Sequence, residues 1–330
     1  MDSPILLVDS YAQIYRGYHA VRYLSTPDGV PTNAVFAMAK FLLKLHREHP
    51  SRCGAFVFDK GRPVFRMELA PDYKANRPPM PEDLRTQLPV IRELIRAFGW
   101  SLVEHDNCEA DDLIASIAEA FPENEIQIFS GDKDISQIID ERVIMLVPNP
   151  SGDVLRRGVA EVREKFGVEP GQLADYLALV GDASDNIPGV EGVGPKTAAA
   201  LLNQFGSAEQ MFSHLDEVKR ETLRTRLAGE KEHFQRNRKL VLLDRKPPEG
   251  TLWKLEDLRR TEPDFDAIRN IADRMSLKSI RKEIDKLAGE SGKTEEEDAS
   301  LFSFHEPREP EAGKNAGKET GTMTQMDLFG

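Results

Sequence analysis

The sequence predicts an α/β protein in which a mostly parallel central sheet is flanked by helices. Short apolar runs that suit buried strands recur through the first half of the chain: PILLV, CGAFVF, EIQIF and VIMLV. Between them lie segments in which apolar residues have helical spacing, such as NAVFAMAKFLLKLHREH at residues 33–49. Strands that alternate with helices favour parallel pairing, because each strand returns to the same edge of the sheet through a crossover.

The second half of the chain has helical patterns with few strand signals. Residues 159–243 contain several short amphipathic segments, and more helix is expected at residues 253–287. Two departures interrupt this organisation. Residues 66–89 are rich in proline and charge, which suits a segment that crosses a cleft, and residues 289–324 are charged and poor in apolar residues, which predicts a disordered acidic linker.

Composition limits the classes of protein that fit. No apolar run approaches the roughly 20 residues of a membrane helix, so no membrane association is expected. Cys53 and Cys108 have no metal-ligand spacing and are expected to be reduced thiols of a cytoplasmic protein. The net charge of −12 argues against nucleic-acid binding, yet residues 289–330 hold ten acids and four bases, half of that excess.

The stretch EADDLIAS places three carboxylates within four residues, at Glu109, Asp111 and Asp112. The apolar stripe that follows predicts a helix beginning near Asp111, and acids in the first turn of a helix are stabilised by its partial positive charge. This structural explanation is sufficient for the stretch alone. Helical spacing also predicts that Glu109 and Asp112 face one direction and Asp111 another, so the trio is expected to divide its contacts with a metal.

Asp9, Asp59, Asp132 and Asp134 follow predicted strands, where the carboxyl ends of a parallel sheet form a ligand-binding crevice, and Asp182 and Asp185 lie at the end of a predicted helix. Each alone could be a turn residue or a helix cap. Together they would repel unless divalent cations with oxygen ligands, two or more Mg²⁺ or Mn²⁺ ions, held them. The predicted metal ligands are Asp9, Asp59, Glu109, Asp111, Asp112, Asp132, Asp134, Asp182 and Asp185.

Two segments offer groups that could hold a phosphodiester. The first has Arg66, Lys74 and Arg77 beside Tyr73, and basic groups pin phosphates while a tyrosine can stack on a base. The second is GVEGVGPKTAAALL, in which Gly192, Gly194 and Lys196 precede or open a helix whose N-terminus could contact a DNA backbone. The alternatives are a solvated loop and an ordinary packing corner between helices.

These motifs resemble those of the 5′-nuclease domain of bacterial DNA polymerase I and, more widely, of the flap endonuclease family. The resemblance covers about residues 1–285 and rests on LLVDSYAQIYRGYHA, FVFDKGRPVFRMELAPDYKANRPPMP, EADDLIAS, SGDKDISQII and YLALVGDASDNIPGVEGVGPKTAAALL. It implies a PIN-like nuclease domain at residues 1–288, with a helical arch at about 66–98 and a helix-hairpin-helix region within 159–243.

The resemblance also assigns roles to residues. The nine acids match the family's metal ligands, while Arg66 and Lys74 match its active-site bases. Tyr15 matches a tyrosine that stacks on the substrate near the cut, and the hairpin around residues 189–196 matches one that grips duplex DNA and in relatives binds K⁺. The implied activity is hydrolysis of DNA phosphodiesters at 5′ flaps, 5′ ends or nicks, for removal of RNA primers and for repair.

No polymerase follows the nuclease domain, so the chain resembles a stand-alone, monomeric, nucleoid-associated form of the enzyme. The C-terminal QMDLF resembles the pentapeptide that docks bacterial replication proteins on the β sliding clamp. Leu328 and Phe329 would be its apolar anchors and Gln325 and Asp327 its polar positions. Two alternatives stay open at this point: a non-catalytic module that binds DNA junctions, and a related metal-dependent ribonuclease.

Overall fold

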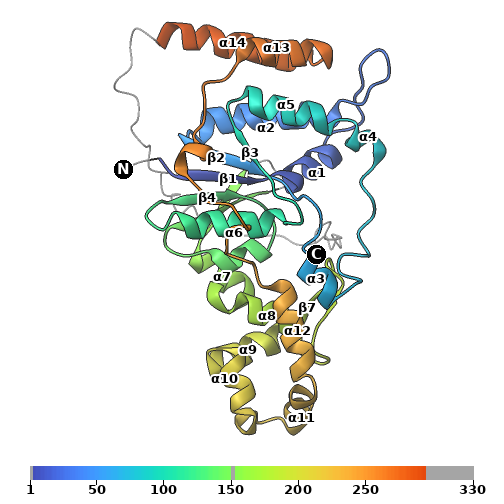
Figure 1. Ribbon diagram of the computed structural model, residues 1–330, viewed down its shortest axis with the longest axis vertical. Helices are drawn as coiled ribbons and strands as arrows, with labels where there is room; N and C mark the ends of the chain where they lie inside the picture. The colour runs from blue at the N-terminus through green and yellow to red at the C-terminus, as the bar shows by residue number, and fades with distance from the viewer. Residues whose placement is uncertain (1–2, 150–152, 295–330) are drawn as a thin grey trace, which may run out of the picture.

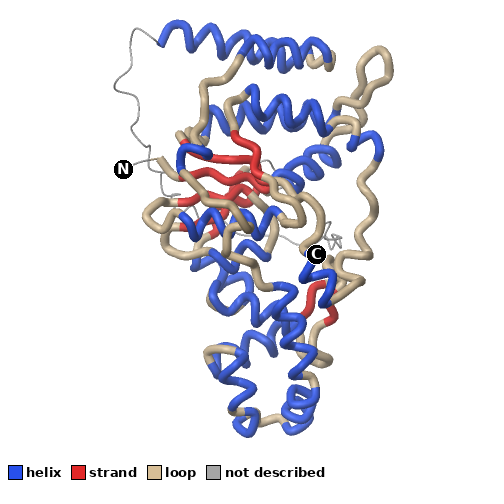
Figure 2. Tube along the Cα trace, in the orientation of Figure 1, coloured by secondary structure: helices blue, strands red, loops and turns tan. Residues whose placement is uncertain are grey.

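The computed structural model describes residues 3–149 and 153–294, and its centre is a six-stranded sheet (Figures 1 and 2). The strand order is β3-β2-β1-β4-β5-β6, in which the first five strands are parallel and β6 is antiparallel to β5. The predicted fold class is therefore confirmed. The strands are β1 (Ile5–Asp9), β2 (Cys53–Val57), β3 (Ser101–Val103), β4 (Ile126–Phe129), β5 (Val143–Pro148) and β6 (Val154–Arg157).

Alternation of side chains along the strands gives the sheet an apolar core on each face. In β1, Leu6 and Val8 face one core while Ile5 and Leu7 face the other, as the two-residue period of a strand requires. The first core is covered by α1 (Ser10–Ala20), α2 (Asn33–Glu48), α5 (Leu88–Ala97), α13 (Phe265–Arg274) and α14 (Lys278–Thr294). The second is covered by α6 (Ala110–Ala120), η1 (Asp134–Ile138) and α7 (Val159–Phe166).

A helical subdomain with its own apolar core extends from the sheet domain and forms the lower end of the molecule in Figure 1. Its core is built around α8 and α12, which pack against each other. Its elements are η2 (Pro170–Gln172), α8 (Leu173–Val180), β7 (Gly181–Asp182), β8 (Ile187–Pro188), α9 (Pro195–Phe205), α10 (Ala208–Ser213), η3 (Leu215–Glu217), α11 (Glu221–Gly229) and α12 (Lys231–Val241); η4 (Leu255–Leu258) follows and leads back to the sheet domain.

The strand order places a crevice at the carboxyl end of β1. From β1 the chain crosses to β2 on one side, and β4 later pairs with the other side, so the crossovers lead in opposite directions at this point. Where the connections from two neighbouring strands run in opposite directions, a crevice forms between them at the carboxyl ends of the strands. Open α/β sheets bind ligands in this crevice. Asp9 ends β1, and the loop after β4 begins at Ser130.

The segment predicted as an arch, residues 66–98, is not one structural unit. Its first part lies in α3 (Val64–Leu69), then a stretch without regular helix leads to α4 (Glu82–Arg85) along one side of the molecule (Figure 1). The remainder forms α5, whose Ile91, Leu94 and Ile95 are buried against the sheet layer. The predicted arch segment therefore extends too far at its C-terminal end, because residues 88–97 form a helix whose apolar side chains pack in the core.

Two further differences concern helices that the sequence analysis did not predict at these positions. Helix α1 begins directly after β1, because Asp9 caps it by accepting a hydrogen bond from the backbone N–H of Ala12 at 3.2 Å. Helix α14 continues to Thr294, so the first residues of the predicted linker, 289–294, are helical. The rest of that linker and the predicted clamp motif at 325–330 lie outside the described residues.

Among the residues that the structure describes, no helix is long and apolar enough to cross a membrane.

Candidate active site

Four aspartates gather at the crevice beyond β1 and β4, and we call Asp9, Asp59, Asp111 and Asp132 the inner acids. The second carboxylate oxygen of Asp9 accepts a hydrogen bond from the hydroxyl of Ser130 at 2.9 Å, which links the ends of the two neighbouring strands. Asp59, which follows β2, accepts from the backbone N–H of Ala110 at 3.1 Å and so fixes the first turn of α6, which carries Asp111.

Burial and neighbouring charges make three of the inner acids, Asp9, Asp59 and Asp111, hard to ionise. Burial, together with the charges of Asp59 and Asp132, raises the pKa of Asp9 to about 7. Burial also raises the pKa of Asp59. The pKa of Asp111 lies well above its ordinary value because this side chain is buried beside Asp132, Asp9 and Asp59. A divalent cation between these groups would remove the repulsion, which is the chemistry that oxygen-rich sites provide for Mg²⁺ or Mn²⁺.

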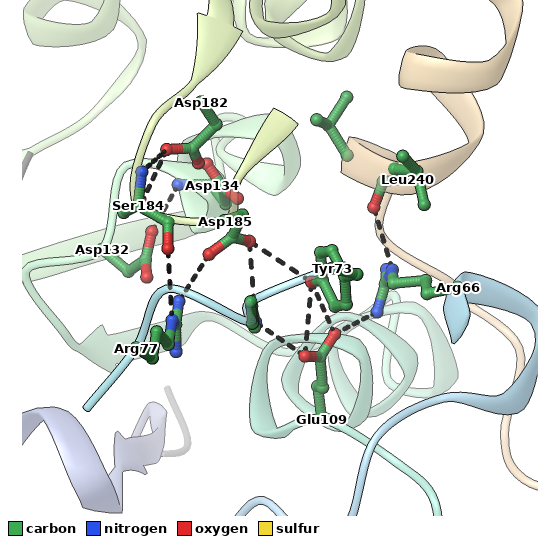
Figure 3. A network of polar contacts seen from close by, with 12 residues as sticks. Arg66, Tyr73, Arg77, Glu109, Asp132, Asp134, Asp182, Ser184, Asp185 and Leu240 are labelled. Atoms are coloured by element: carbon green, nitrogen blue, oxygen red, sulfur yellow. Dashed lines mark hydrogen bonds and ion pairs between the residues drawn. The ribbon is translucent and has the colours of Figure 1, made fainter. Parts of the chain in front are cut away.

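Three further aspartates form a second cluster, which we call the outer acids: Asp134, Asp182 and Asp185 (Figure 3). One carboxylate oxygen from each lies within 4.8 Å of the others, close enough for a single ion to contact all three. Oδ1 of Asp134 is buried and accepts no hydrogen bond from the described residues. A buried oxygen without a donor is costly, so this atom fits a metal ligand.

The outer acids are brought together by a tight turn between β7 and β8. Gly181 has φ of 85°, and a side chain on it would lie 2.3 Å from the backbone nitrogen of Gly189. Only glycine permits this approach, which closes the hairpin that carries Asp182 and Asp185. Within the turn, Ser184 donates to Asp182 from its backbone N–H at 2.9 Å and from its hydroxyl at 2.6 Å.

Glu109 and Asp112 differ from Asp111 in their partners, because both pair with basic side chains whereas Asp111 lies beside Asp132, Asp9 and Asp59. Both carboxylates pair with Arg66, and Asp112 also accepts from the backbone N–H of Asp244 at 2.9 Å. Burial alone would raise the pKa of Glu109, but Lys74 and Arg66 lower it below its ordinary value. Asp112 pairs with the buried guanidinium of Arg66 and belongs to neither acid cluster, so its prediction as a metal ligand finds no support in the geometry.

Arg66 was predicted to be a basic active-site residue that holds the scissile phosphate, and its burial in the structure contradicts this role. Its side chain is 2% exposed. Besides its two carboxylate partners, it donates to the backbone oxygens of Leu240 at 2.9 Å and Leu242 at 3.0 Å. Every nitrogen of the guanidinium is therefore used inside the protein, where it joins α3, α6 and the end of α12.

Tyr73 was predicted to stack on a base of the substrate, and this prediction is also wrong. The residue is only 3% exposed, and its ring packs in the core of the helical subdomain. Its hydroxyl lies 3.1 Å from Glu109 and 3.2 Å from Asp185 (Figure 3). The sequence placed Tyr73 among exposed charges, but its burial follows from long-range packing that spacing does not reveal.

Lys74, Arg77 and Tyr15 do lie at the opening of the site. All three line a pocket of about 220 Å³ together with Asp59 and Glu109. Lys74 Nζ lies 2.6 Å from Glu109 and 3.6 Å from Asp185, and its backbone has φ of 55°, a strained value for a residue with a side chain. Arg77 donates to Asp185 at 2.6 Å while about half of its side chain is exposed.

The glycine-rich hairpin lies between β8 and α9, in the helical subdomain. Gly192 has φ of 76°, and a side chain there would lie 2.5 Å from Nη1 of Arg226, which also donates to the backbone oxygen of Glu191 at 3.2 Å. Gly194 precedes the first turn of α9, where Lys196 is exposed. The hairpin thus presents a helix N-terminus and a lysine at the surface, as an interface with phosphates requires.

Sequence reasoning missed two residues that organise the acids. Ser130 bonds to Asp9, and Lys133 forms an ion pair with Asp182 at 3.1 Å. Both belong to the segment SGDKD, in which only the aspartates were predicted to have a role. A hydroxyl and an amine placed directly beside acids after a strand were the available signals.

Comparison with known proteins agrees with this arrangement. The family described as 5′-3′ exonuclease, N-terminal resolvase-like domain, matches residues 4–167, and the 5′-3′ exonuclease C-terminal SAM fold matches residues 168–266. The chain is 37% identical to a 5′-3′ exonuclease of Aquifex aeolicus, across 86% of this chain and 96% of that protein. It is equally 37% identical to the thermostable DNA polymerase I of Thermus thermophilus, but there it spans only 36% of the relative's length.

Solved structures share the fold at lower identity. The T5 5′-exonuclease with bound zinc ions has a TM-score of 0.63 at 22% identity, covering 86% of this chain and 99% of that one. The catalytic core of Rad2 in complex with a DNA substrate has a TM-score of 0.60 at 17% identity, covering 86% of this chain and 90% of that one. At such identities these structures establish the fold alone.

Replacing Arg66 should destabilise the protein strongly. Arg66→Met would leave Glu109 and Asp112 buried with fewer partners, and breaking a buried ion pair on one side typically costs about 3–5 kcal/mol. Arg77→Met, at a half-exposed ion pair, should cost less than about 1 kcal/mol. Urea unfolding of both variants measures the difference, and similar losses in the two would refute the structural role of Arg66.

The metal-free protein should lose stability as pH rises from about 4 to 7. In that range the unfolded chain has released the proton of Asp9, whose ordinary pKa is 3.8, whereas the folded protein retains it because its pKa is about 7. The free energy of unfolding that is lost through Asp9 should be on the order of 2–4 kcal/mol. Asp9→Asn should flatten the dependence in urea unfolding with chelator present, and a wild-type stability that rises over this range would contradict the prediction.

Proposed function

The chain belongs to the 5′-3′ exonuclease family, and from that premise we propose that it is a structure-selective, divalent-metal-dependent 5′-nuclease. It hydrolyses DNA phosphodiesters at 5′ flaps, 5′ ends or nicks, in the removal of RNA primers and in repair. The observation that carries this proposal is the pair of acid clusters at the crevice, one of which holds an oxygen of Asp134 that has no hydrogen-bond donor within residues 3–149 and 153–294.

The inner and outer acids are the groups that would hold divalent ions, two or more Mg²⁺ or Mn²⁺. Such ions supply charge neutralisation at the phosphate and a bound water of lowered pKa. Asp9, Asp111 and Asp134 suit this task because burial and neighbouring carboxylates already disfavour their ionised forms without a cation. Glu109 is the one acid of the site that shares its oxygens with Lys74, Tyr73 and Arg66, so it orients these groups rather than binding a metal directly.

Lys74 and Arg77 bind the scissile phosphate in this proposal. Both line the pocket beside Asp59, and both pair with Asp185, an outer acid that a bound cation would neutralise. A phosphodiester that enters the pocket would therefore bind ammonium and guanidinium groups that are already directed at the site. Tyr15, which lines the same pocket from α1, is positioned to stack on a nucleotide next to the cut.

The remaining segments would select the substrate's shape. Residues 70–81, between α3 and α4, would cover the single strand, and the hairpin with Gly192, Gly194 and Lys196 would contact the backbone of the downstream duplex. Backbone contacts carry no sequence information, which suits an enzyme that recognises structure. A K⁺ ion at the hairpin belongs to this proposal as well.

The proposal extends to location and partners. The enzyme acts as a cytoplasmic, nucleoid-associated monomer and docks on the β sliding clamp through residues 325–330. Tethering through the residues that precede this motif would raise its effective concentration at replicated DNA without any new contact at the active site.

Two other functions have less support from the structure. A non-catalytic junction-binding module would have no need of a buried, unpartnered carboxylate oxygen such as that of Asp134. A metal-dependent ribonuclease would use similar acids, and a comparison of RNA with DNA flaps of equal sequence distinguishes it from the proposed enzyme.

Asp111→Asn should abolish cleavage while leaving DNA binding largely intact. The amide cannot balance the charge of a divalent ion, whereas the DNA-contacting groups are unchanged, and loss of a metal ligand should lower the rate at least about 100-fold. The assay is cleavage of a labelled double-flap duplex with Mg²⁺, with binding measured separately in Ca²⁺.

Glu141→Gln is the matched control, because Glu141 is exposed in the loop before β5 and lies outside the acid clusters. It should cleave like the wild type. Full turnover by Asp111→Asn would refute the assignment of the site.

Deletion of residues 325–330 should leave cleavage of small flap substrates unchanged and abolish binding to the bacterial β clamp. The removed residues include Leu328 and Phe329, the two apolar anchors. Surface plasmon resonance with immobilised clamp measures the effect, and equal affinity of the deletion variant and the full chain would end this part of the proposal.

A further inference from the structure

The ion pair between Lys133 and Asp182 is the starting point. Lys133 lies in the loop between β4 and η1, and its ammonium is 3.1 Å from Oδ2 of Asp182. The other oxygen of Asp182, Oδ1, accepts two hydrogen bonds from Ser184. Asp182 is 4% exposed, so water contributes little to it. Both oxygens of this outer acid are thus bound by the protein itself.

The two sets of donors on Asp182 differ in how easily they can leave. Ser184 belongs to the same tight turn, and its bonds follow from the backbone of the β7–β8 hairpin. Lys133 comes from another element and reaches Asp182 through a flexible four-carbon stem that is 21% exposed. An ion that approached the outer acids could therefore bind Oδ2 of Asp182 only after the ammonium withdrew.

Asp134 differs from Asp182, because one of its carboxylate oxygens has no hydrogen-bond donor among the described residues. This atom is the buried Oδ1, and one oxygen of Asp134 lies within 4.8 Å of ligand atoms on Asp182 and Asp185. The outer cluster therefore combines a carboxylate oxygen that has no hydrogen-bond donor in the part of the chain that the structure describes with one that a lysine covers. Lys74 and Arg77, which pair with Asp185, line the proposed substrate pocket and have another role there.

We propose that Lys133 is a positioning residue that competes with a divalent cation for Asp182 and so weakens ion binding at the outer acids. This inference rests on the proposed function, since it assumes that these acids hold a metal. In the metal-free protein the ammonium replaces part of the missing positive charge and keeps Asp182 directed at the cluster. When an ion binds, the ammonium is displaced, and its removal from a carboxylate at about 3 Å costs electrostatic energy that lowers the ion's affinity.

The test is calorimetric titration of Mn²⁺ into the metal-free protein at pH 8 without DNA. Lys133→Met keeps the length of the stem and removes the charge, and it should bind Mn²⁺ at the outer acids at least about tenfold more tightly than the wild type. Lys133→Arg, which keeps the charge, should stay within about threefold of the wild type. Lys40→Met removes a lysine that pairs with Glu283, away from the acids, and should not change Mn²⁺ binding.

A second pair of variants tests whether the change in Mn²⁺ affinity arises at the outer acids. In Asp182→Asn, which removes the carboxylate that Lys133 covers, adding Lys133→Met should give no gain in affinity. Equal or weaker Mn²⁺ binding by Lys133→Met, or a gain of the same size in the Asp182→Asn background, would overturn the inference.

Cleavage of a 5′-flap duplex by the wild type with Mn²⁺ separates this inference from the proposed function. A wild type that binds Mn²⁺ and cleaves, alongside an unchanged Lys133→Met, refutes the role of Lys133 alone. A wild type that neither binds Mn²⁺ nor cleaves refutes the proposed function and the inference with it.

Discussion

The crowding of carboxylates at one edge of a parallel sheet is the constraint on which the rest of the structure depends. Nine acids lie at or near this edge, and four basic side chains within it, Arg66, Lys74, Arg77 and Lys133, form ion pairs with them. The bases are distributed unevenly. They engage Glu109, Asp112, Asp182 and Asp185, whereas no ion pair joins a base to Asp9, Asp59 or Asp111 among the residues described. Basic side chains thus neutralise part of the charge of Glu109, Asp112, Asp182 and Asp185, whereas the charge of Asp9, Asp59 and Asp111 is left for a cation to balance.

The same ion pairs join the two parts of the molecule. Arg66 lies in α3, pairs with α6 of the sheet domain and donates to backbone oxygens at the end of α12 in the helical subdomain. Tyr73 likewise packs in the core of the helical subdomain while its hydroxyl contacts Glu109. Because the outer acids Asp182 and Asp185 belong to the helical subdomain, these links determine how the two acid clusters face each other. Geometry at the metal site therefore depends on packing between the subdomains.

The sequence predicted the sheet and the acids because both depend on local pattern. Apolar runs predict the strands, and Asp9, Asp59, Asp132 and Asp134 follow strands that end at one edge, so the convergence of these four acids could be inferred from the amino-acid pattern alone. The roles of Arg66 and Tyr73 could not, because burial of a charged or polar side chain depends on contacts with residues more than a hundred positions away, such as Leu240 and Asp185. The prediction for the arch failed in part for the same reason, since residues 88–97 pack on α2. Lys133 and Ser130 were visible in the sequence but were not given a role.

The central claim is that both acid clusters hold divalent ions. Anomalous scattering from crystals of the protein grown with Mn²⁺ tests it most directly. Two peaks are expected, one between the inner acids Asp9, Asp59, Asp111 and Asp132, and one in contact with Asp134, Asp182 and Asp185. Crystals that show no manganese at these carboxylates in saturating Mn²⁺ would contradict the claim.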